Sequence, residues 1–302
     1  MGLIIGIDGG GTNTRSLLTN EEGDILGSAI GGAANFRSEG VEMVKTHLKE
    51  LLEATCKNAG TPLSEVDVVS LGLAGVATDE GKRTIKNIVV DLGFDADKVI
   101  VNSDADIALI GAHGKEEGII AIAGTGAVVF GQKGDRKVRS SGWGHILGDE
   151  GSAYWIGIEC MKAVIAAHDL HIKETKLTAA LVGHLRLEKI SELIDFTYSQ
   201  TTKSEIAALA QLVMQHYSDD EAARSIINNG ARHLFDHINH VHGLLGDDLS
   251  VCLMGGMLEN ETPLKHSLTQ LLDQKEIRHL SEPTYRPEYG AVIVGLRKLS
   301  IA

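Results

Sequence analysis

Proline, cysteine and basic residues are all scarce in this chain. The 302 residues include only 4 prolines and 3 cysteines, and 28 Lys+Arg stand against 41 Asp+Glu, a formal charge of −13 at pH 7. So little proline excludes collagen-like chains and proline-rich disorder. The acidic balance argues against a nucleic-acid partner, because a polyanion would meet net repulsion instead of a basic surface.

The three cysteines, Cys56, Cys160 and Cys252, are far apart and odd in number. They predict neither a disulfide framework nor a Cys-x-x-Cys metal or redox pair, and a reducing compartment fits best. The chain also lacks any uncharged apolar run near the about 18 residues that a membrane span needs. No basic leader precedes the apolar segment 3–8. We therefore expect a cytoplasmic protein with no membrane partner.

Glycine, by contrast, is abundant, with 35 residues, while 43% hydrophobic and 23% charged residues are ordinary for a folded protein. The length corresponds to about two domains at roughly 100–200 residues each. Glycine allows backbone conformations that other residues avoid and lets a ligand or another segment come close to the backbone. The positions at which glycines cluster therefore indicate candidate turns and binding sites.

The first part of the chain predicts three strands, at 3–8, 14–19 and 25–30, joined by short turns. A helix follows from about residue 38 to 58, where Val41, Val44, Leu48, Leu51 and Leu52 have helical spacing. A strand at 66–73, a helix at 79–92, a strand at 99–102 and a further helix complete a β-β-β-α-β-α-β-α pattern. We expect this first domain to span residues 1–113.

A second unit repeats the opening pattern, with strands at 119–123 and 127–131 around a glycine turn and a third strand near Val138. Residues 150–243 have an almost entirely helical pattern, and a strand at 249–254 ends in two glycines. Helices follow near 262–274 and 288–299. We expect a second domain at 114–287, with the C-terminal helix 288–302 joining the first.

Three glycine clusters stand at ends of predicted strands: Gly9-Gly10-Gly11-Thr12, Gly124-Thr125-Gly126 and Gly255-Gly256. Backbone N–H groups in such turns can face an anion that bulky side chains would exclude, and phosphate is the natural guest. No P-loop pattern occurs, and a strand instead of a helix follows the first cluster, which disfavours a dinucleotide-binding oxidoreductase. Each cluster alone also fits a plain turn, but together they indicate a nucleotide bound between two domains.

This combination resembles the superfamily of sugar kinases, heat-shock ATPases and actin. More specifically, the segment 141–155, SGWGHILGDEGSAYW, is similar to the long signature of N-acetylglucosamine kinases. Further matches are the segments 6–12, 33–35, 102–105 and 290–291, whereas residues 170–243 carry little that matches. The resemblance implies an α/β fold of two actin-like, ribonuclease H-like domains, with mixed sheets flanked by helices and the ligands in the interdomain cleft.

The resemblance also implies that Asp104 is the catalytic carboxylate facing a sugar hydroxyl. An acid at the carboxyl end of a strand suits this role, because it can orient the attacking hydroxyl and accept its proton. The alternative is that Asp104 caps the helix that follows, although Ser103 can supply that cap. Asp106 is the nearest rival and falls inside the predicted helix, where an exposed or capping charge is the other interpretation.

The remaining roles are likewise implied by the resemblance. Asp8 would hold Mg²⁺ through water, which suits a cation that keeps several waters beside substrate phosphates. ATP would be bound by all three glycine clusters, with Thr12 and Thr125 contacting phosphates. Sugar-binding residues would be Asn35, Asp104, Gly142, Trp143 and Asp149. Each of three residues also has a structural interpretation. Trp143 could be an aromatic residue of the core, Asp149 could cap a helix that begins at Glu150, and Asp8 could stabilise a turn.

Arg37 leaves the sugar specificity open, and a group of histidines raises the separate question of a metal site. Arg37 stands two places after Asn35, where the family often has a bulky aromatic residue. It either faces solvent or pairs with an anionic substituent such as the lactyl carboxylate of N-acetylmuramic acid.

His233, His237 and His240 share one face of a predicted helix, yet no cysteine or carboxylate completes a metal site convincingly.

We therefore expect an ATP- and Mg²⁺-dependent amino-sugar kinase, with homodimerisation as a family-level expectation. Its sugar is N-acetylglucosamine by first choice, with glucosamine, N-acetylmannosamine and N-acetylmuramic acid left open. An ATP-hydrolysing regulator without kinase activity is the alternative of another class. Iron-sulfur dehydratase activators, which share the ATPase fold, are disfavoured because they need paired cysteines.

Overall fold

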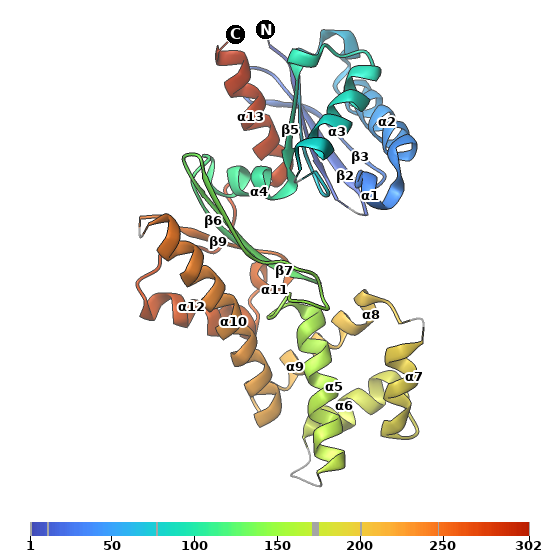
Figure 1. Ribbon diagram of the computed structural model, residues 1–302, viewed down its shortest axis with the longest axis vertical. Helices are drawn as coiled ribbons and strands as arrows, with labels where there is room; N and C mark the ends of the chain where they lie inside the picture. Colours follow the sequence, from blue (N-terminus) through green and yellow to red (C-terminus); the bar gives the residue numbers. More distant parts are fainter. Residues whose placement is uncertain are drawn as a thin grey trace. The chain divides into compact units, whose positions relative to one another are not determined.

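The computed structural model describes residues 2–10, 12–76, 78–170, 175–199, 201–246 and 248–301. Its contacts divide the chain into two compact units (Figure 1). Unit 1 comprises Met1–Glu117 and Pro283–Ala302, and unit 2 comprises Gly118–Glu282. No helix in the described part of the chain has the length and apolar character needed to cross a membrane.

Unit 1 is built on a five-stranded mixed sheet in the order β3-β2-β1-β4-β5. The strands are β1 (Ile4–Gly9), β2 (Thr14–Thr19), β3 (Ile25–Gly31), β4 (Val68–Leu73) and β5 (Val99–Ser103). β1 and β2 are antiparallel, as are β2 and β3, whereas β1, β4 and β5 run parallel. β1 and β4 are almost fully buried, in keeping with sequences that are apolar apart from Asp8 in β1 and Ser70 in β4.

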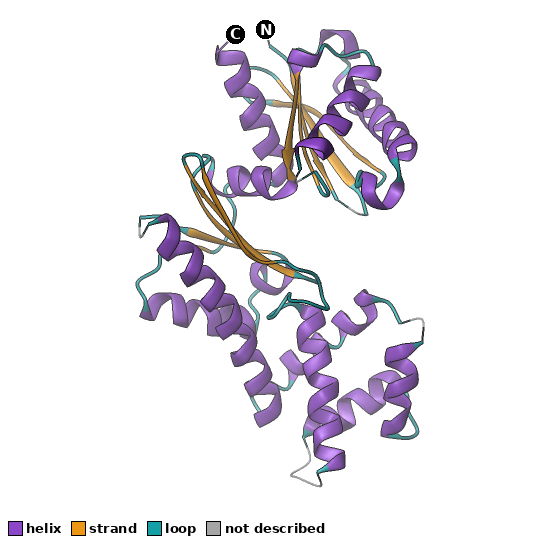
Figure 2. Cartoon of the chain, in the orientation of Figure 1, coloured by secondary structure: helices purple, strands orange, loops and turns teal. Residues whose placement is uncertain are grey.

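Helices lie on both faces of this sheet (Figure 2). They are α1 (Phe36–Glu39), α2 (Val41–Ala59), α3 (Asp79–Asp91), α4 (Asp104–His113) and α13 (Pro287–Ile301), with 3₁₀ turns η1 (Leu63–Glu65) and η2 (Ala96–Lys98). α2 and α3 pack on one face, and α4 and α13 pack on the other, so the end of the chain lies against its first strand.

The helix predicted from about residue 38 is interrupted at Gly40, which separates α1 from α2. Of its expected apolar positions, Val44, Leu48, Leu51 and Leu52 are buried, but Val41, the first residue of α2, is 41% exposed. Gly60 ends α2 in the left-handed conformation that glycine adopts at low cost.

Unit 2 repeats the topology of unit 1, with the strand order β10-β9-β6-β7-β8. Its strands are β6 (Gly118–Ala123), β7 (Ala127–Lys133), β8 (Arg136–Ser141), β9 (Val251–Met254) and β10 (His279–Leu280). β6, β7 and β8 form an antiparallel meander, and β9 and β10 add in parallel to β6. The repeated strand-turn-strand pattern of the sequence therefore corresponds to a repeated mixed sheet.

The helices of unit 2 surround one large apolar core. They are α5 (Ala153–Asp169), α6 (Lys176–Leu185), α7 (Leu193–Tyr198), α8 (Lys203–Ala208), α9 (Ala210–Gln215), α10 (Glu221–Leu245), α11 (Gly256–Glu259) and α12 (Pro263–Gln274), with the 3₁₀ turn η3 (Ile190–Glu192). α10 packs on the sheet and on α12, while α5 contacts α6, α8, α9 and α10. In each unit the glycine turn follows the first strand of the sheet.

Candidate active site

The parallel strands of unit 1 end at one edge of the sheet, and the predicted acidic residues lie at that edge. Asp8 on β1 is paired with Gly72 on β4, which is in turn paired with Asn102 on β5. Asp104 follows one residue after the end of β5. Carboxyl ends of parallel strands are the usual place for ligand-binding groups in α/β sheets, and this edge collects both carboxylates.

Asp104 does not cap the helix that it begins, so the alternative interpretation of this residue is wrong. The Ser103 hydroxyl accepts the N–H of Asp106 at 3.2 Å, and the Asp106 carboxylate accepts the N–H of Ser103 at 3.1 Å. This reciprocal capping box explains the buried Asp106, which takes the capping role and not the exposed one among its alternative interpretations. Asp104, by contrast, is exposed at the edge of the sheet.

Asp8 has an unusually basic carboxylate. Burial, together with the negative charges of Glu288 and Asp104, raises its pKa from 3.8 to about 6, although Arg15 acts in the opposite direction. Glu288 on α13 is itself buried, and its Oε2 atom has no hydrogen-bond partner among the described residues. The described residues of unit 1 therefore place three carboxylates near one another, and the charge of Arg15 offsets their repulsion only in part.

The described residues of the first glycine cluster lie between the end of β1 and the start of β2. The Gly9 carbonyl accepts the N–H of Ala74 at 2.8 Å, and the Gly10 carbonyl accepts the N–H of Ala34 at 3.1 Å. A Cβ atom on Gly9 would come within 2.4 Å of the Leu73 side chain. Thr12 is exposed. Gly11, also predicted to bind ATP, lies outside the described residues.

Asn35 caps α1 beside the loop that follows β4. Its Oδ1 atom accepts the backbone N–H of Arg37 at 3.1 Å, and it lies 2.6 Å from the place that a Cβ on Gly75 would occupy. Gly75 has φ +85°, so this loop requires glycine for both backbone conformation and space. The Arg37 Nε atom donates to the Gly75 carbonyl at 2.9 Å, which orients an otherwise exposed guanidinium.

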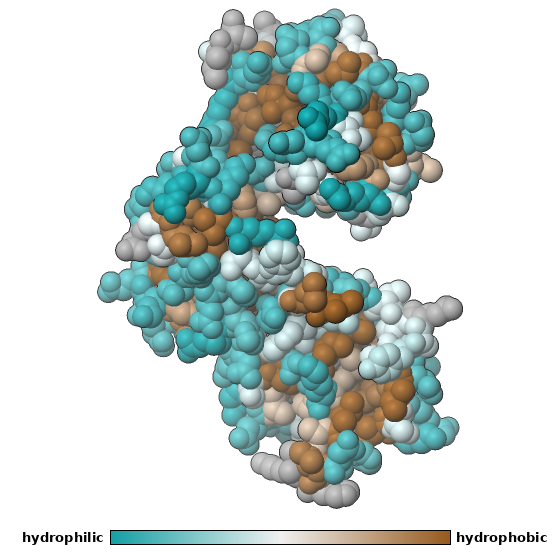
Figure 3. All heavy atoms as spheres, in the orientation of Figure 1, coloured by the Kyte–Doolittle hydropathy of each residue, from teal (hydrophilic) through white to brown (hydrophobic). Residues whose placement is uncertain are grey.

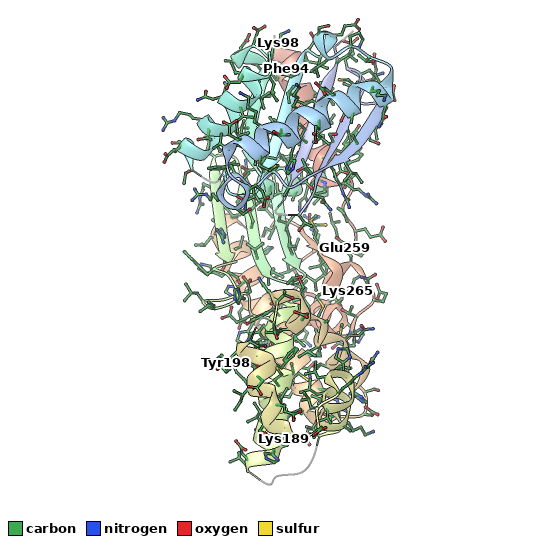
Figure 4. All side chains as sticks on the ribbon, turned by 90° about the vertical axis from the view of Figure 1, so that its right-hand side faces the viewer. Phe94, Lys98, Lys189, Tyr198, Glu259 and Lys265 are labelled. Atoms are coloured by element: carbon green, nitrogen blue, oxygen red, sulfur yellow. The ribbon has the colours of Figure 1, made fainter. Side chains whose placement is uncertain are left out.

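Two of the predicted ATP-binding clusters come together in unit 2. Gly124 and Gly126 close a short turn through an N–H to carbonyl bond of 2.9 Å, with Thr125 exposed at its tip. A Cβ on Gly255 would lie 2.5 Å from the Ala123 carbonyl, so this cluster is next to the turn. Gly255 donates its N–H to the Glu259 carboxylate at 2.9 Å. Glu259, at the end of α11, is labelled in Figure 4. Gly256 is exposed, with open space where its Cβ would be.

The loop after β8 exposes its apolar side chains. Gly142 and Gly144 have φ values of +74° and +87°, and between them Trp143 is 73% exposed. The interpretation of Trp143 as a core aromatic is therefore wrong. Ile146 and Leu147 are exposed as well. Figure 3 shows hydrophobic side chains reaching the surface of unit 2 among hydrophilic ones.

Asp149 is buried at the end of this loop and has a positive φ of 63°, which is uncommon for a residue other than glycine. Helix α5 begins at Ala153 and is capped by Ser152, so Asp149 does not cap it, contrary to the alternative interpretation. Instead, the Asp149 carboxylate accepts the N–H of Gly144 at 3.3 Å and the ammonium of Lys203 at 3.2 Å.

The carboxylate of Asp149 also adjoins the second glycine turn. Its Oδ2 atom lies 2.7 Å from the position that a Cβ on Gly126 would occupy. Asp149, which was predicted to bind the sugar, thus lies next to Gly126, which was predicted to bind ATP, within unit 2.

The histidines of α10 have individual contacts. His237 shares a hydrogen bond of 2.8 Å with the Ser140 hydroxyl, and burial lowers its pKa. The His233 ring packs edge-on against Trp155. Among the described residues there is no group of three or more His, Cys, Asp or Glu side chains arranged to hold a metal ion.

Three residues that were not among the predicted site residues lie next to them: Gly75, Lys203 and Glu288. Glu288 precedes the Gly290-Ala291 pair of the resemblance, so a local signal was available for it. Lys203 lies in the helical stretch without recognisable motifs, and its place became apparent only from its ion pair with Asp149.

Two mixed sheets of one topology, each with a glycine turn after its first strand, define the actin-like ATPase fold expected from the sequence. A crystal structure of a candidate N-acetylglucosamine kinase from Chromobacterium violaceum has this fold. It has a TM-score of 0.76 and 26% identity to this chain, with 98% of this chain and 99% of that chain covered.

The sequence model of the BadF/BadG/BcrA/BcrD ATPase family matches residues 5–295, and the chain belongs to this family. It is 36% identical over 266 residues to the N-acetylmuramic acid/N-acetylglucosamine kinase of Clostridium acetobutylicum, with 86% of this chain and 87% of the relative covered. It is 29% identical over 311 residues to the N-acetyl-D-glucosamine kinase of Dictyostelium discoideum, with 97% and 98% covered. These relatives confirm the expected enzyme class, an ATP-dependent kinase of the N-acetylglucosamine kinase type.

Proposed function

We propose that this protein transfers the γ-phosphoryl group of ATP to the 6-hydroxyl of N-acetylglucosamine. The observation that carries the proposal is the place of Asp104, exposed at the carboxyl end of β5, while Ser103 and Asp106 form the capping box of α4. One Asp104 carboxylate oxygen also accepts the N–H of Ala105 at 2.9 Å. Kinases of the family that are named for N-acetylglucosamine support this choice of sugar.

In the proposed reaction, the sugar O6 atom attacks the γ-phosphorus as the bond from that phosphorus to the β-γ bridging oxygen breaks. Asp104 orients the hydroxyl and accepts its proton, and ADP leaves with the electrons of the broken bond. Phosphoryl transfer needs little covalent chemistry from the protein, so positioning and charge stabilisation supply most of the acceleration.

We assign phosphate binding to the glycine turns of both units, with hydroxyl contacts from Thr12 and Thr125. Gly255 and Gly256 would accept the nucleobase. The sugar would be bound by Asn35, Gly142, Trp143 and Asp149. The Asn35 amide and the Asp149 carboxylate would form hydrogen bonds with the sugar hydroxyls, and the exposed Trp143 indole would contact the apolar face of the sugar. We further propose that units 1 and 2 correspond to the two actin-like domains, with the C-terminal helix in the first.

Asp8 at the edge of unit 1 fits a magnesium ion that is held through water and not by a cluster of three carboxylates. Asp8, with its raised pKa, stands near two further carboxylates, and a buried oxygen of Glu288 lacks a partner among the described residues. A divalent cation would relieve this concentration of negative charge, and Asp8 would hold it, through water as the family resemblance implies. When bound, Mg²⁺ would neutralise phosphate charge during transfer.

A second substrate, N-acetylmuramic acid, is favoured by Arg37. Its guanidinium is exposed and anchored at Nε to the Gly75 carbonyl, and no carboxylate of the described residues pairs with it. The lactyl ether of N-acetylmuramic acid carries a carboxylate, for which an oriented guanidinium is a suitable partner. The Clostridium acetobutylicum relative is named for both sugars.

We also propose that the protein acts in the cytoplasm as a homodimer. The buried, free cysteines Cys56, Cys160 and Cys252 are compatible with a reducing compartment. Light scattering after size-exclusion chromatography tests the dimer, and a monomer at micromolar concentration would contradict it.

The proposed base is tested by Asp104→Asn. We expect turnover of N-acetylglucosamine to fall by about 10²–10⁴-fold, because the variant cannot accept the proton, while the Kd for ATP stays within about threefold. Asp97→Asn, at an exposed position before β5, is the matched control and should keep full activity. An Asp104→Asn variant that retains most of its turnover would show that the base is wrongly assigned.

The sugar is tested by a panel of N-acetylglucosamine, glucosamine, N-acetylmannosamine and N-acetylmuramic acid, with glucose as control. Sugar-dependent ADP release with a 6-phosphate product is the expected result. ATP consumption that is identical with every sugar and without sugar would instead favour an ATP-hydrolysing regulator.

The role of Arg37 is tested by Arg37→Ala. Loss of a charge-assisted hydrogen bond worth about 1.5–3 kcal/mol should lower kcat/KM for N-acetylmuramic acid by about 10–100-fold. The same variant assayed on N-acetylglucosamine, which lacks the lactyl carboxylate, is the internal control and should change less than about threefold. Equal losses on both sugars, or none on either, would rule out the carboxylate contact.

A further inference from the structure

Lys203 in unit 2 lies beside the second glycine turn, although no motif marks it in the sequence. Its Nζ atom is 3.2 Å from Asp149 Oδ2 and 3.4 Å from the position that a Cβ on Gly126 would occupy. The Asp149 side chain is 6% exposed and the Lys203 side chain 35% exposed. The ammonium thus has a buried anionic partner and lies 5.9 Å from the centroid of the Tyr154 ring, while the side chain as a whole stays partly exposed.

The backbone of Lys203 is held in place from two directions. A capping box between Thr202 and Glu205 fixes the start of α8, with the Thr202 N–H donating to the Glu205 carboxylate at 2.7 Å. Helix α8 also lies so close to α5 that a Cβ on Gly157 would be 2.1 Å from the Ile206 carbonyl oxygen. The lysine is therefore directed at the turn by the packing of two helices.

The space beside the Lys203 ammonium and the Gly124–Gly126 turn suits an anion larger than a carboxylate. Gly124 has open space where its Cβ would be, and Thr125 is exposed at the tip of the turn. A lysine ammonium has three donors, so two remain when one is directed at Asp149. In a chain of net charge −13, a cation beside this turn would lower the electrostatic cost of binding a polyphosphate.

We propose that Lys203 binds a phosphate oxygen of ATP at the Gly124–Gly126 turn, with Asp149 holding its ammonium in position. The inference rests on the proposed function, because it assumes that this turn binds the triphosphate. It assigns to the helical region a nucleotide contact that the glycine clusters alone do not provide.

The test is direct binding of the ATP analogue AMPPNP with Mg²⁺, measured by titration calorimetry in the absence of sugar. Lys203→Met should weaken binding about tenfold or more, and Lys203→Arg should stay within about threefold of wild type, because it retains the charge. Lys176→Met is the matched control, since Lys176 pairs with Asp219 at 2.7 Å in the same unit. This control should bind AMPPNP as wild type does.

A double variant separates direct binding from an effect through Asp149. Lys203→Met leaves a buried carboxylate without its cation, which by itself disfavours folding and repels phosphate. Lys203→Met combined with Asp149→Asn removes that carboxylate charge. We expect the double variant to fold and still to bind AMPPNP weakly. Wild-type affinity in the double variant would overturn the proposal, because the lysine would then only neutralise Asp149.

The outcomes distinguish this proposal from the proposed function. If Lys203→Met loses AMPPNP affinity but the wild type phosphorylates no amino sugar, the kinase assignment fails and the lysine contact stands. If the wild type is an amino-sugar kinase and Lys203→Met binds AMPPNP normally, the lysine contact fails alone. A wild type that binds no AMPPNP overturns both.

Discussion

Asp8 shows how a candidate ligand-binding carboxylate can reduce the stability of the unit that carries it. Its pKa is raised to about 6, first by burial and then by the charges of Glu288 and Asp104. A folded-state pKa above the unfolded value of 3.8 means that folding favours the protonated form. The associated stability is fully present below about pH 4 and is lost as the pH rises through about 6.

We therefore expect Asp8→Asn to unfold at higher urea concentration than wild type at pH 8, without ligand. A shift of about two pKa units sets an upper bound of about 3 kcal/mol on the gain. The gain should shrink at pH 5, where Asp8 is largely protonated. Asp97→Asn at an exposed position is the control and should show no such trend. A difference between Asp8→Asn and wild type that is the same at both pH values would contradict this account.

The crossing of α4 and α13 in unit 1 depends on glycine. A Cβ on Gly290 would lie 2.0 Å from the Ile107 carbonyl oxygen and 2.7 Å from the Gly111 nitrogen. Both contacts are with backbone atoms, so the helices themselves must move apart if a side chain is added. Helix α4 begins with Asp104, and its displacement would also move the proposed base.

Gly290→Ala should consequently lower the free energy of unfolding by about 1–3 kcal/mol and reduce turnover, as measured by urea unfolding and kinase assay. Gly243→Ala is the matched control, because Gly243 is exposed within α10 and has open space for a Cβ. That control should gain about 0.5–1 kcal/mol from higher helix propensity. A Gly290→Ala protein as stable as wild type would show that the crossing has room.

The contact of α5 with α8 in unit 2 allows a parallel experiment. Gly157→Ala would place a Cβ 2.1 Å from the Ile206 carbonyl oxygen and push α8 away, carrying Lys203 from the turn. We expect weaker AMPPNP binding by several-fold, as well as a lower unfolding midpoint. Gly183→Ala in α6, with open space at its Cβ, should leave binding unchanged. Destabilisation with unaltered AMPPNP affinity would show that α8 does not need this position.

For the molecule as a whole, unit 1 is assembled from both ends of the chain. Helix α13 packs on β1, β2, β4 and α4, and its residues Ala291 and Val292 are fully buried. A chain ending at residue 282 should therefore lose the cooperative unfolding of unit 1, whereas residues 118–282 alone should fold. Circular dichroism and hydrogen exchange test this, with a chain ending at residue 299 as control. Native-like protection of β1 without α13 would contradict it.

Much of the fold could be predicted from the sequence because the informative patterns are local. Three-strand meanders with glycine turns, the parallel strands that follow and the long helix α2 leave short-range signals of period and turn chemistry, whereas α5 and α10 were expected only as parts of the helical stretch 150–243. The two-residue strand β10 leaves no such signal and was not predicted. The helices between residues 175 and 215 were expected only as a general helical stretch.

The succession of strands along the chain apart from β10, the glycine turns between them and the motifs of the family resemblance follow from the sequence by itself, since each depends on neighbouring residues. The order of the strands within each sheet came from the tertiary structure. Only the tertiary structure decided that Ser103 caps α4, that Trp143 is exposed and that Asp149 contacts Lys203 instead of capping α5. The abundance of glycine predicted that backbone freedom matters in this chain. The sequence did not predict which residues the glycines contact, because the contacts of Gly290 with Ile107 and of Gly157 with Ile206 join segments that meet only when helices pack.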